Sequence, residues 1–310
     1  MNAFGAKWGS VLVVGILLPI RVASAGAQDI QPRFLRYAPV GSMGVGLAYN
    51  YSSGAVLPNK TLPVEDVRAR IHSVAGAYSV YFDVFGITGR MSLGGVLTSG
   101  KWEGDVGDAG DVGAVVTQTG LGDPVVGAAL LVVGGPSRSA SEFRTHTETT
   151  FVGVSVRVRV PLGQYDPNQV INIGSNRWSV SPRLGVSHAF GRHWNVDGYA
   201  SAWLFTDNRA FVGGSTFSQA LLMSLQAHLE YEFDNGIWLA ASTRQSFGGE
   251  TSINGVGRDN PQLNNRVGLT VNIPISRHNQ LRVALTTGLS TSAGNDYTSF
   301  YVTWAHGWIL

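Results

Sequence analysis

The chain has 310 residues, including 40 glycines and 12 prolines, and only 14% of its residues are charged. This composition argues against a protein built from long helices. The absence of cysteine excludes a disulfide framework and thiolate chemistry. A formal net charge of +2 gives no indication of nucleic acid as a partner.

The N-terminus has the order of a secretory signal peptide. Lys7 precedes an apolar run over residues 11–20, and small residues follow at positions 23–27. The run is too short for a transmembrane helix, which needs about 20 apolar residues. We therefore predict a cleaved signal over residues 1–27, with a retained membrane anchor as the alternative. We expect residues 28–40 to form a periplasmic lead-in to the next domain, or else a plug that folds into it.

Residues 41–310 are predicted to form one domain of period-two strands. In the clearest segment, Val152, Val154 and Val156 alternate with small or polar residues. Such alternation is typical of strands with one apolar and one polar face. Twelve segments follow this pattern, at residues 44–51, 67–82, 87–97, 125–133, 152–160, 178–186, 194–204, 221–233, 237–247, 266–273, 281–286 and 298–310.

The connections between these segments alternate in length. Long connections rich in Gly, Asn and Asp follow the odd-numbered segments, and short turns follow most even-numbered ones. This asymmetry is typical of bacterial outer-membrane barrels. We therefore predict an all-β fold, a single antiparallel up-and-down transmembrane β-barrel of about 12 strands. Residues 100–120 are expected to form one long loop. Residues 134–148 are long where a short turn is expected, so they are either a periplasmic excursion or a sign of misplaced strand ends.

The last segment has an aromatic-rich face. Phe300, Val302, Trp304 and Trp308 share it, with His306 between them. An apolar strand at the end of a chain suits a barrel that closes in lipid, where it pairs with both the first and the eleventh segment. A final strand of a soluble sandwich is the alternative. The strand also resembles the signal that the barrel assembly machinery recognises, so we expect this machinery and outer-membrane lipid as partners. His306 is expected near the periplasmic interface.

Aromatic residues near the strand ends predict two interfacial girdles, because aromatic rings prefer the membrane interface. The loop-side girdle would contain Tyr51, Trp178 and Phe205, and the turn-side girdle would contain Tyr81, Trp194, Phe233 and Trp238.

Several runs carry a family resemblance. They are GLGD at 120–123, PLGQYD at 161–166, NIGSNRWS at 172–179, LGVS at 184–187 and FTDN at 205–208, together with Pro182. These runs resemble the outer-membrane barrel family named for the meta-pathway of phenol degradation. The resemblance covers nearly all of residues 41–310. It implies an outer-membrane location and uptake of aromatic or other hydrophobic compounds, and it brings no catalytic or binding residues to transfer.

Many charged residues fall on the polar faces of the predicted strands. A charge that faced lipid at mid-bilayer would cost about 2–4 kcal/mol, so these residues are expected to face the lumen. One interpretation is structural, with arginines and carboxylates paired across a packed interior. The other is a polar pore wall that favours anions, with inward Tyr199 and Trp203 offering stacking surfaces to aromatic rings. The candidate lumen or substrate-path residues are Arg90, Arg157, Arg159, Arg183, Asp197, Tyr199, Trp203, His228, Glu230, Arg244, Arg266 and Arg282.

Catalytic and cofactor motifs are not evident. The seven histidines have no metal-ligand spacing, and the glycine run at 120–122 lacks the rest of a phosphate loop. We expect no metal, no cofactor and no enzymatic activity, and a barrel hydrolase is the weakest alternative. The leading hypothesis is an outer-membrane channel or transporter for small hydrophobic, aromatic or anionic organic compounds. The alternative is a non-transporting structural or surface-interaction barrel that acts through its long loops.

Overall fold

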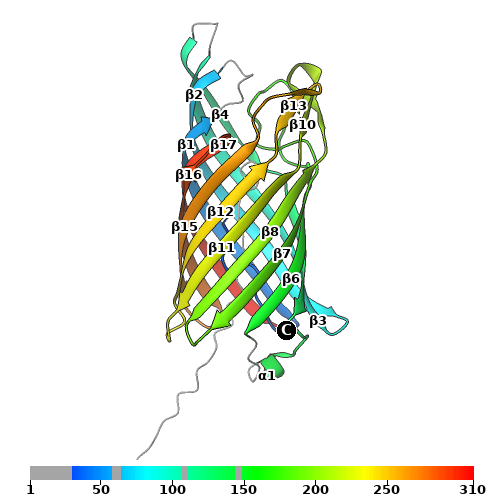
Figure 1. Cartoon of the computed structure of the whole chain (residues 1–310), viewed down its shortest axis with the longest axis vertical. Helices are drawn as coiled ribbons and strands as arrows, with labels where there is room; N and C mark the ends of the chain where they lie inside the picture. The colour runs from blue at the N-terminus through cyan, green and yellow to red at the C-terminus, as the bar shows by residue number, and fades with distance from the viewer. Residues whose placement is uncertain (1–29, 58–63, 107–110, 144–148) are drawn as a thin grey trace, which may run out of the picture.

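The fold is a closed barrel, which Figure 1 shows as a computed structural model that describes residues 30–57, 64–106, 111–143 and 149–310. The predicted signal peptide, residues 1–27, lies outside these ranges. The C-terminus lies at one end of the barrel beside the short helix α1 (Ala140–Phe143), and we name this the lower end.

One antiparallel sheet closes on itself, because its order runs from β2 through β1 and β17 round to β3, and β2 also pairs with β3. β4 and β5 pair with successive parts of β3, so together they occupy one position in a wall of twelve. The predicted twelve-stranded antiparallel barrel is confirmed. Its strands are β1 (Ser42–Leu57), β2 (Val64–Val84), β3 (Ile87–Val106), β4 (Asp111–Leu121), β5 (Val125–Val133), β6 (Thr150–Arg159), β7 (Ser179–Phe190), β8 (Trp194–Phe205), β11 (Leu222–Glu232), β12 (Trp238–Gly248), β15 (Gln262–Pro274), β16 (Asn279–Ser290) and β17 (Gly294–Ile309).

The first and last strands seal the barrel. Their register runs without a break from Ser42 opposite Ile309 to Leu57 opposite Gly294. On the other side of β17, His306 lies opposite Asn279, which follows the short turn at the lower end. His306 Nδ1 is 3.0 Å from the Asn279 side-chain oxygen. The histidine is therefore at the end of the barrel that the sequence predicts to be periplasmic.

The upper end carries more strand than predicted. Residues 100–120 were expected to be a loop, but β3 continues to Val106 and β4 begins at Asp111. The Val and Thr residues of β4 favour this extension, because β-branched residues fit a pleated ladder. Four short strands form a separate sheet nearby (Figure 1); they are β9 (Asn208–Phe211), β10 (Ser215–Gln219), β13 (Thr251–Ile253) and β14 (Val256–Gly257), with the 3-10 turn η1 at Val212–Gly214.

The connection after β5 is long, because β5 ends at Val133 and β6 begins at Thr150. In its described part, Pro136 forms a bridge with Ile87, and α1 follows it at the lower end. The predicted strand end at Val133 is confirmed, and β6 begins two residues before the predicted start at Val152.

Apolar side chains face outward and polar ones face inward. Leu93, Leu225 and Leu269 are 56%, 52% and 65% exposed, whereas Asp197 and Glu230 are buried. A closed barrel with an apolar exterior satisfies all of its backbone groups within its own wall, as a lipid environment requires. No helix in the described ranges is long and apolar enough to cross a membrane.

Three aromatic residues differ from the girdle prediction. Tyr81 and Trp238 are each 2% exposed and point inward, and Phe205 stacks on the buried Trp203. Successive residues of a strand point to opposite faces of the sheet. A predicted facing that is wrong by one residue therefore assigns a ring to the lipid side when it lies in the lumen. Trp178, Trp194 and Phe233 are exposed on the outside, as predicted.

Candidate functional site

The segment before β1 lies inside the barrel. Ile30, Gln31, Phe34 and Leu35 are almost completely buried and contact inward side chains of several strands. We call residues 30–40 the inner segment. The sequence left two alternatives for residues 28–40, a periplasmic lead-in or a plug inside the barrel. Residues 30–40 lie inside, where the apolar residues of the segment have matching sites on the inner wall.

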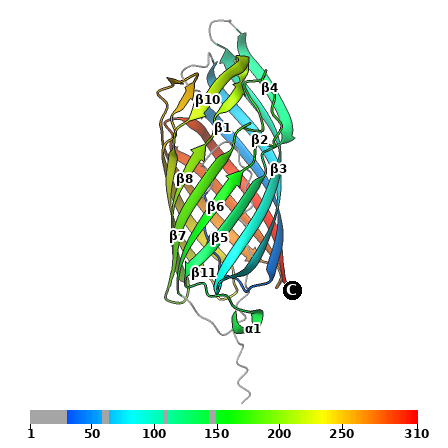
Figure 2. The ribbon, with the colours of Figure 1, turned by 90° about the vertical axis from the view of Figure 1, so that its right-hand side faces the viewer.

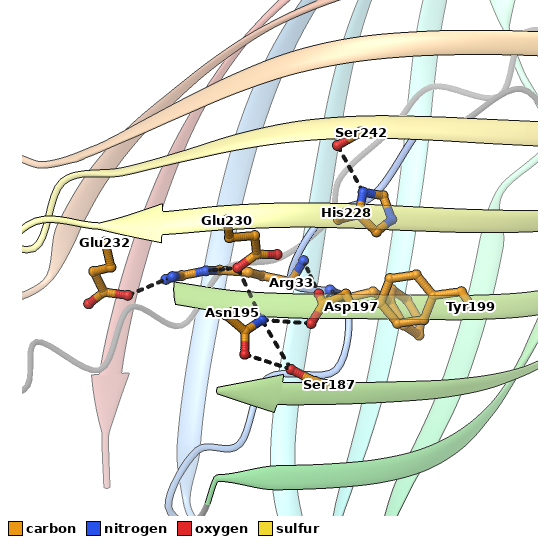
Figure 3. Close-up of polar contacts among 10 residues, drawn as sticks. Arg33, Ser187, Asn195, Asp197, Tyr199, His228, Glu230, Glu232 and Ser242 are labelled. Atoms are coloured by element: carbon orange, nitrogen blue, oxygen red, sulfur yellow. Dashed lines mark hydrogen bonds and ion pairs between the residues drawn. The ribbon is translucent and has the colours of Figure 1, made fainter. Parts of the chain in front are cut away.

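An ion network holds the inner segment to β8 and β11. The Arg33 side chain donates through Nε to Glu230 and lies 2.6 Å from a Glu232 carboxylate oxygen through Nη2. Its backbone N–H donates to Asp197 at 2.8 Å. Asn195 links the two buried carboxylates, with its amide nitrogen 2.8 Å from Asp197 and 3.3 Å from Glu230 (Figure 3). Burying carboxylates is costly unless they are paired, so Arg33 provides the compensating cation.

Tyr199 extends this network along β8. Its hydroxyl donates to Asp197 and also accepts the backbone N–H of Phe34 at 3.0 Å. On the neighbouring strand, His228 Nδ1 is 2.8 Å from the Ser242 hydroxyl, and its ring lies 5.3 Å from the Tyr199 ring. Four predicted residues, Asp197, Tyr199, His228 and Glu230, are thus brought together (Figure 3).

Two arginines of the wall pack on the ring of Phe34. The guanidinium carbon of Arg183 on β7 is 4.3 Å from the ring centroid, and that of Arg90 on β3 is 4.9 Å from it. Arg90 also donates to the Phe34 carbonyl oxygen at 3.2 Å, and Arg183 donates to Gln31 at 2.7 Å. A cation over an aromatic ring is attracted by its quadrupole, most strongly where water is excluded.

Leu35 fits into a notch made by two glycines. Gly153 on β6 and Gly185 on β7 are cross-strand partners. A Cβ atom at either position would lie 2.7 Å from a Leu35 methyl carbon, which is closer than side chains tolerate. The wall is therefore shaped to receive this leucine.

Two further predicted arginines lie nearer the upper end. The guanidinium carbons of Arg157 and Arg159 are 5.1 and 5.4 Å from the ring of Trp203. Above them, Arg177 packs over Phe205 at 4.4 Å and over Phe217 at 4.9 Å. Burial, together with the nearby charge of Arg159, lowers the pKa of Arg177 to about 10. The upper lumen thus carries arginines stacked on aromatic rings.

The remaining predicted arginines are buried but do not share one site. Arg282 packs over Trp238 at 5.0 Å, on a ring that Arg33 also covers at 4.5 Å. Arg244 and Arg266 are direct partners on β12 and β15, and Arg266 donates to the Tyr297 carbonyl oxygen at 2.6 Å.

Two small hollows adjoin the inner segment. One has Arg33, Arg36, Trp238 and Asn272 among its lining residues. The other lies between Phe34 and the wall residues Tyr81 and Arg90. Within the described ranges, no three His, Asp or Glu side chains are grouped so that they could hold a metal ion.

Three of the sequence motifs that resemble the family meet at Asp123, which lies between β4 and β5. They are the motifs at 120–123, 161–166 and 172–179. The Asp123 carboxylate accepts the N–H of Gly163 at 2.8 Å and the N–H of Ser175 at 2.9 Å. A buried carboxylate with two backbone donors fixes these loops against the upper end of the wall.

The sequence reasoning missed Arg33, Phe34 and Trp238 as lumen residues. A signal was present, because residues 33–37 place Arg33 and Arg36 among apolar residues. A solvent-exposed segment is usually poor in large apolar residues, so this composition indicates a buried segment.

Comparisons with known proteins agree with this architecture. The family model described as "Putative MetA-pathway of phenol degradation" matches residues 44–305. The COG4313 outer membrane channel from Pseudomonas putida F1 is similar in fold, with a TM-score of 0.74, 20% identity, and coverage of 90% of this chain and 100% of that chain. The transport unit of the autotransporter AIDA-I from Escherichia coli is more distant, with a TM-score of 0.50, 10% identity, and coverage of 92% and 94%. No curated protein matches significantly. The family match extends over most of the chain and agrees with the motifs that meet at Asp123, and the chain therefore belongs to the phenol-degradation MetA-pathway family.

Proposed function

We propose that this chain is an outer-membrane channel for small aromatic and anionic organic compounds. Its lower end, with α1 and the C-terminus, would face the periplasm, and its upper loops would face outward. The apolar exterior of the closed wall and the family membership support this placement.

The observation that carries the proposal is the position of Phe34. The barrel already binds an aromatic ring in its lumen, against the guanidiniums of Arg90 and Arg183. That ring belongs to the inner segment and not to the wall. When the ring is absent, the same two cations would accept the ring of a solute, and a carboxylate on the solute would pair with them.

Planar-bilayer recordings of the purified barrel test this function. The Phe34→Ala variant should be blocked by benzoate at roughly tenfold lower concentration than the wild type, because two cation–π contacts of about 0.5–1 kcal/mol each become available. Acetate, which has the charge without the ring, should block both proteins equally. The control is Phe85→Ala, which removes a fully exposed ring from the turn between β2 and β3.

A channel that conducts no ions in the wild type or in Phe34→Ala, and that shows no benzoate-dependent block, contradicts the proposal. The second candidate, a surface-interaction barrel, is favoured by the four-stranded sheet β9–β10–β13–β14 above the wall. It predicts that disrupting this sheet abolishes binding of a partner while any conductance is unchanged.

A further inference from the structure

A cluster of basic residues lies on the outer surface of β2 and β3. Arg68, Arg70 and Lys101 are exposed and point away from the lumen, in phase with the exposed Val74 and Leu97 lower on the same strands. Their inward neighbours Ala69 and Ile71 are buried. We call Arg68, Arg70 and Lys101 the outer basic patch.

The height of the patch matches a lipid headgroup region. On β2 the outward series runs from Phe82 near the lower end through Tyr78 and Val74 to Arg70. A strand rises about 3.3 Å per residue, so Phe82 and Arg70 are roughly 40 Å apart along the strand. With a tilt of about 40°, this separation is roughly 30 Å along the barrel axis, just beyond an apolar band of about 25 Å.

The polarity of the outer surface changes in steps toward the patch. Immediately below it, the Tyr49 hydroxyl is 2.8 Å from His72 Nδ1, and the hydroxyls of Ser99 and Thr119 are 2.8 Å apart. Lower still are the apolar Leu47, Val74 and Leu97. The sequence of apolar, hydroxyl-bearing and cationic levels follows the sequence of acyl chains, glycerol or sugar, and phosphate in a lipid leaflet.

Charge at the patch is unbalanced among the described side chains. Arg70 and Lys101 are direct cross-strand partners, and Arg68 lies opposite Glu103. Like charges directly opposite each other destabilise a sheet. Glu103 forms an ion pair with Lys101, and it is the one carboxylate among the described side chains that line a depression around the three cations. A bound anion between Arg70 and Lys101 would relieve this repulsion.

The patch also surrounds a hollow. A shallow depression is lined by Ser53, Gly54, Arg68, Ala69, Arg70, Lys101 and Glu103. It lies where β1, β2 and β3 run side by side, away from α1 and the C-terminus (Figure 2). Guanidinium and ammonium groups around a depression suit a phosphate group.

We propose that the outer basic patch binds the phosphate groups of lipid A, the phosphorylated glycolipid of the outer leaflet. Its acyl chains would then lie against Leu47, Val74 and Leu97, and its sugar would meet the hydroxyl level. The proposal rests on the outer-membrane placement proposed above, and it is independent of whether the barrel conducts solutes.

The test is binding of lipid A to the folded, detergent-purified barrel, measured by native mass spectrometry and by a fluorescence titration. The variant combines Arg70→Gln with Lys101→Gln. The matched control is Arg192→Gln, which removes an exposed arginine from the turn between β7 and β8 at the lower end. Bisphosphorylated lipid A, lipid A stripped of its phosphates, and inorganic phosphate are compared as ligands.

We expect bisphosphorylated lipid A to bind the wild type and Arg192→Gln equally, and to bind the double variant at least tenfold more weakly. Dephosphorylated lipid A should bind all three proteins weakly. Equal binding of bisphosphorylated lipid A to the double variant and the control overturns the proposal, and so does undiminished binding without the phosphates. If inorganic phosphate competes at concentrations similar to those of lipid A, the patch is a general anion site and the lipid assignment is wrong.

Folding of the double variant is checked by circular dichroism and by its shift on unheated gels. If it does not fold, the single variant Lys101→Gln replaces it, with an expected loss of at least threefold. Unchanged binding in that variant contradicts the proposal as well. Conductance is recorded in parallel, and it should be the same in all of these proteins because no altered residue faces the lumen.

Discussion

The lower and upper parts of the lumen differ in how their arginines are bound. In the lower part, Arg33 of the inner segment pairs with the wall carboxylates Glu230 and Glu232, and wall arginines such as Arg282 also pack on rings there. In the upper part, the arginines belong to the wall and pack on aromatic rings, as with Arg157 and Arg159 on Trp203. The lower part therefore binds a piece of its own chain tightly, whereas the upper part presents cations that have a weaker, less directional hold.

We infer that the lower network holds the inner segment in place, whereas the upper arginines interact with solutes. A buried carboxylate without its cation is strongly unfavourable, so the lower network keeps the inner segment in place. Contacts between a guanidinium and an aromatic face are individually weaker, about 0.5–2 kcal/mol each. Three variants test this division, beginning with the largest expected effect.

Arg33→Ala should release the inner segment. Removing one partner of a buried ion pair costs about 3–5 kcal/mol. Here the loss should destabilise the docking of the inner segment and not the wall, because the wall is held by its own backbone hydrogen bonds. The expected result is a several-fold rise in single-channel conductance and rapid protease cleavage within residues 30–40. Arg192→Ala, which loses an exposed pair with Asp234, is the control and should behave like the wild type. Unchanged conductance and protection in Arg33→Ala would show that the lower network does not hold the segment.

Gly185→Ala should loosen the same segment by steric means. The new methyl group would lie 2.7 Å from Leu35 Cδ1 and 2.5 Å from Tyr199 Cδ1. Overpacking of this kind costs about 1–3 kcal/mol, so protease cleavage should be faster than in the wild type but slower than in Arg33→Ala. Gly198→Ala on the neighbouring strand is a matched control, because a Cβ there meets nothing within 4 Å. If the two alanine variants are equally protected, the glycine notch is not a docking site.

Replacing both Arg157 and Arg159 with Gln should change selectivity more than stability. The two side chains contribute positive charge to the upper lumen, so their loss should shift the reversal potential in a salt gradient toward cations. Protease protection of residues 30–40 should remain as in the wild type, because Arg33 and Phe34 are held by other wall residues. A selectivity equal to that of Arg192→Gln would mean that the upper arginines serve only to pack the interior.

The sequence predicted the wall well because strand faces are encoded locally. Alternation such as that of Val152, Val154 and Val156 decides which side chains meet lipid, and the same parity places Asp197 and Glu230 inside. The prediction was wrong for Trp238, where an interfacial preference was given more weight than parity.

The position of the inner segment could not be predicted from local alternation. It has no strand period, and its partners Asp197 and Glu230 lie far away in the sequence. The carboxylates themselves were a partial signal, since buried acids on neighbouring strands require a cation. Nothing in the local sequence says whether that cation comes from the wall or from Arg33.

The seam between β1 and β17 has a consequence for assembly. It pairs Ser42 with Ile309, so the barrel cannot become a closed ring until almost the whole chain has been delivered. Contacts this distant in sequence form slowly, because the entropy of closing the loop is lost before the ladder stabilises it. The inner segment is joined directly to β1, and it lies inside the finished ring. The open, unsealed sheet is therefore the stage at which Arg33 can reach Glu230 without threading, and a segment that misses this stage must enter through the lower mouth, beside the contact of Tyr37 with Pro136.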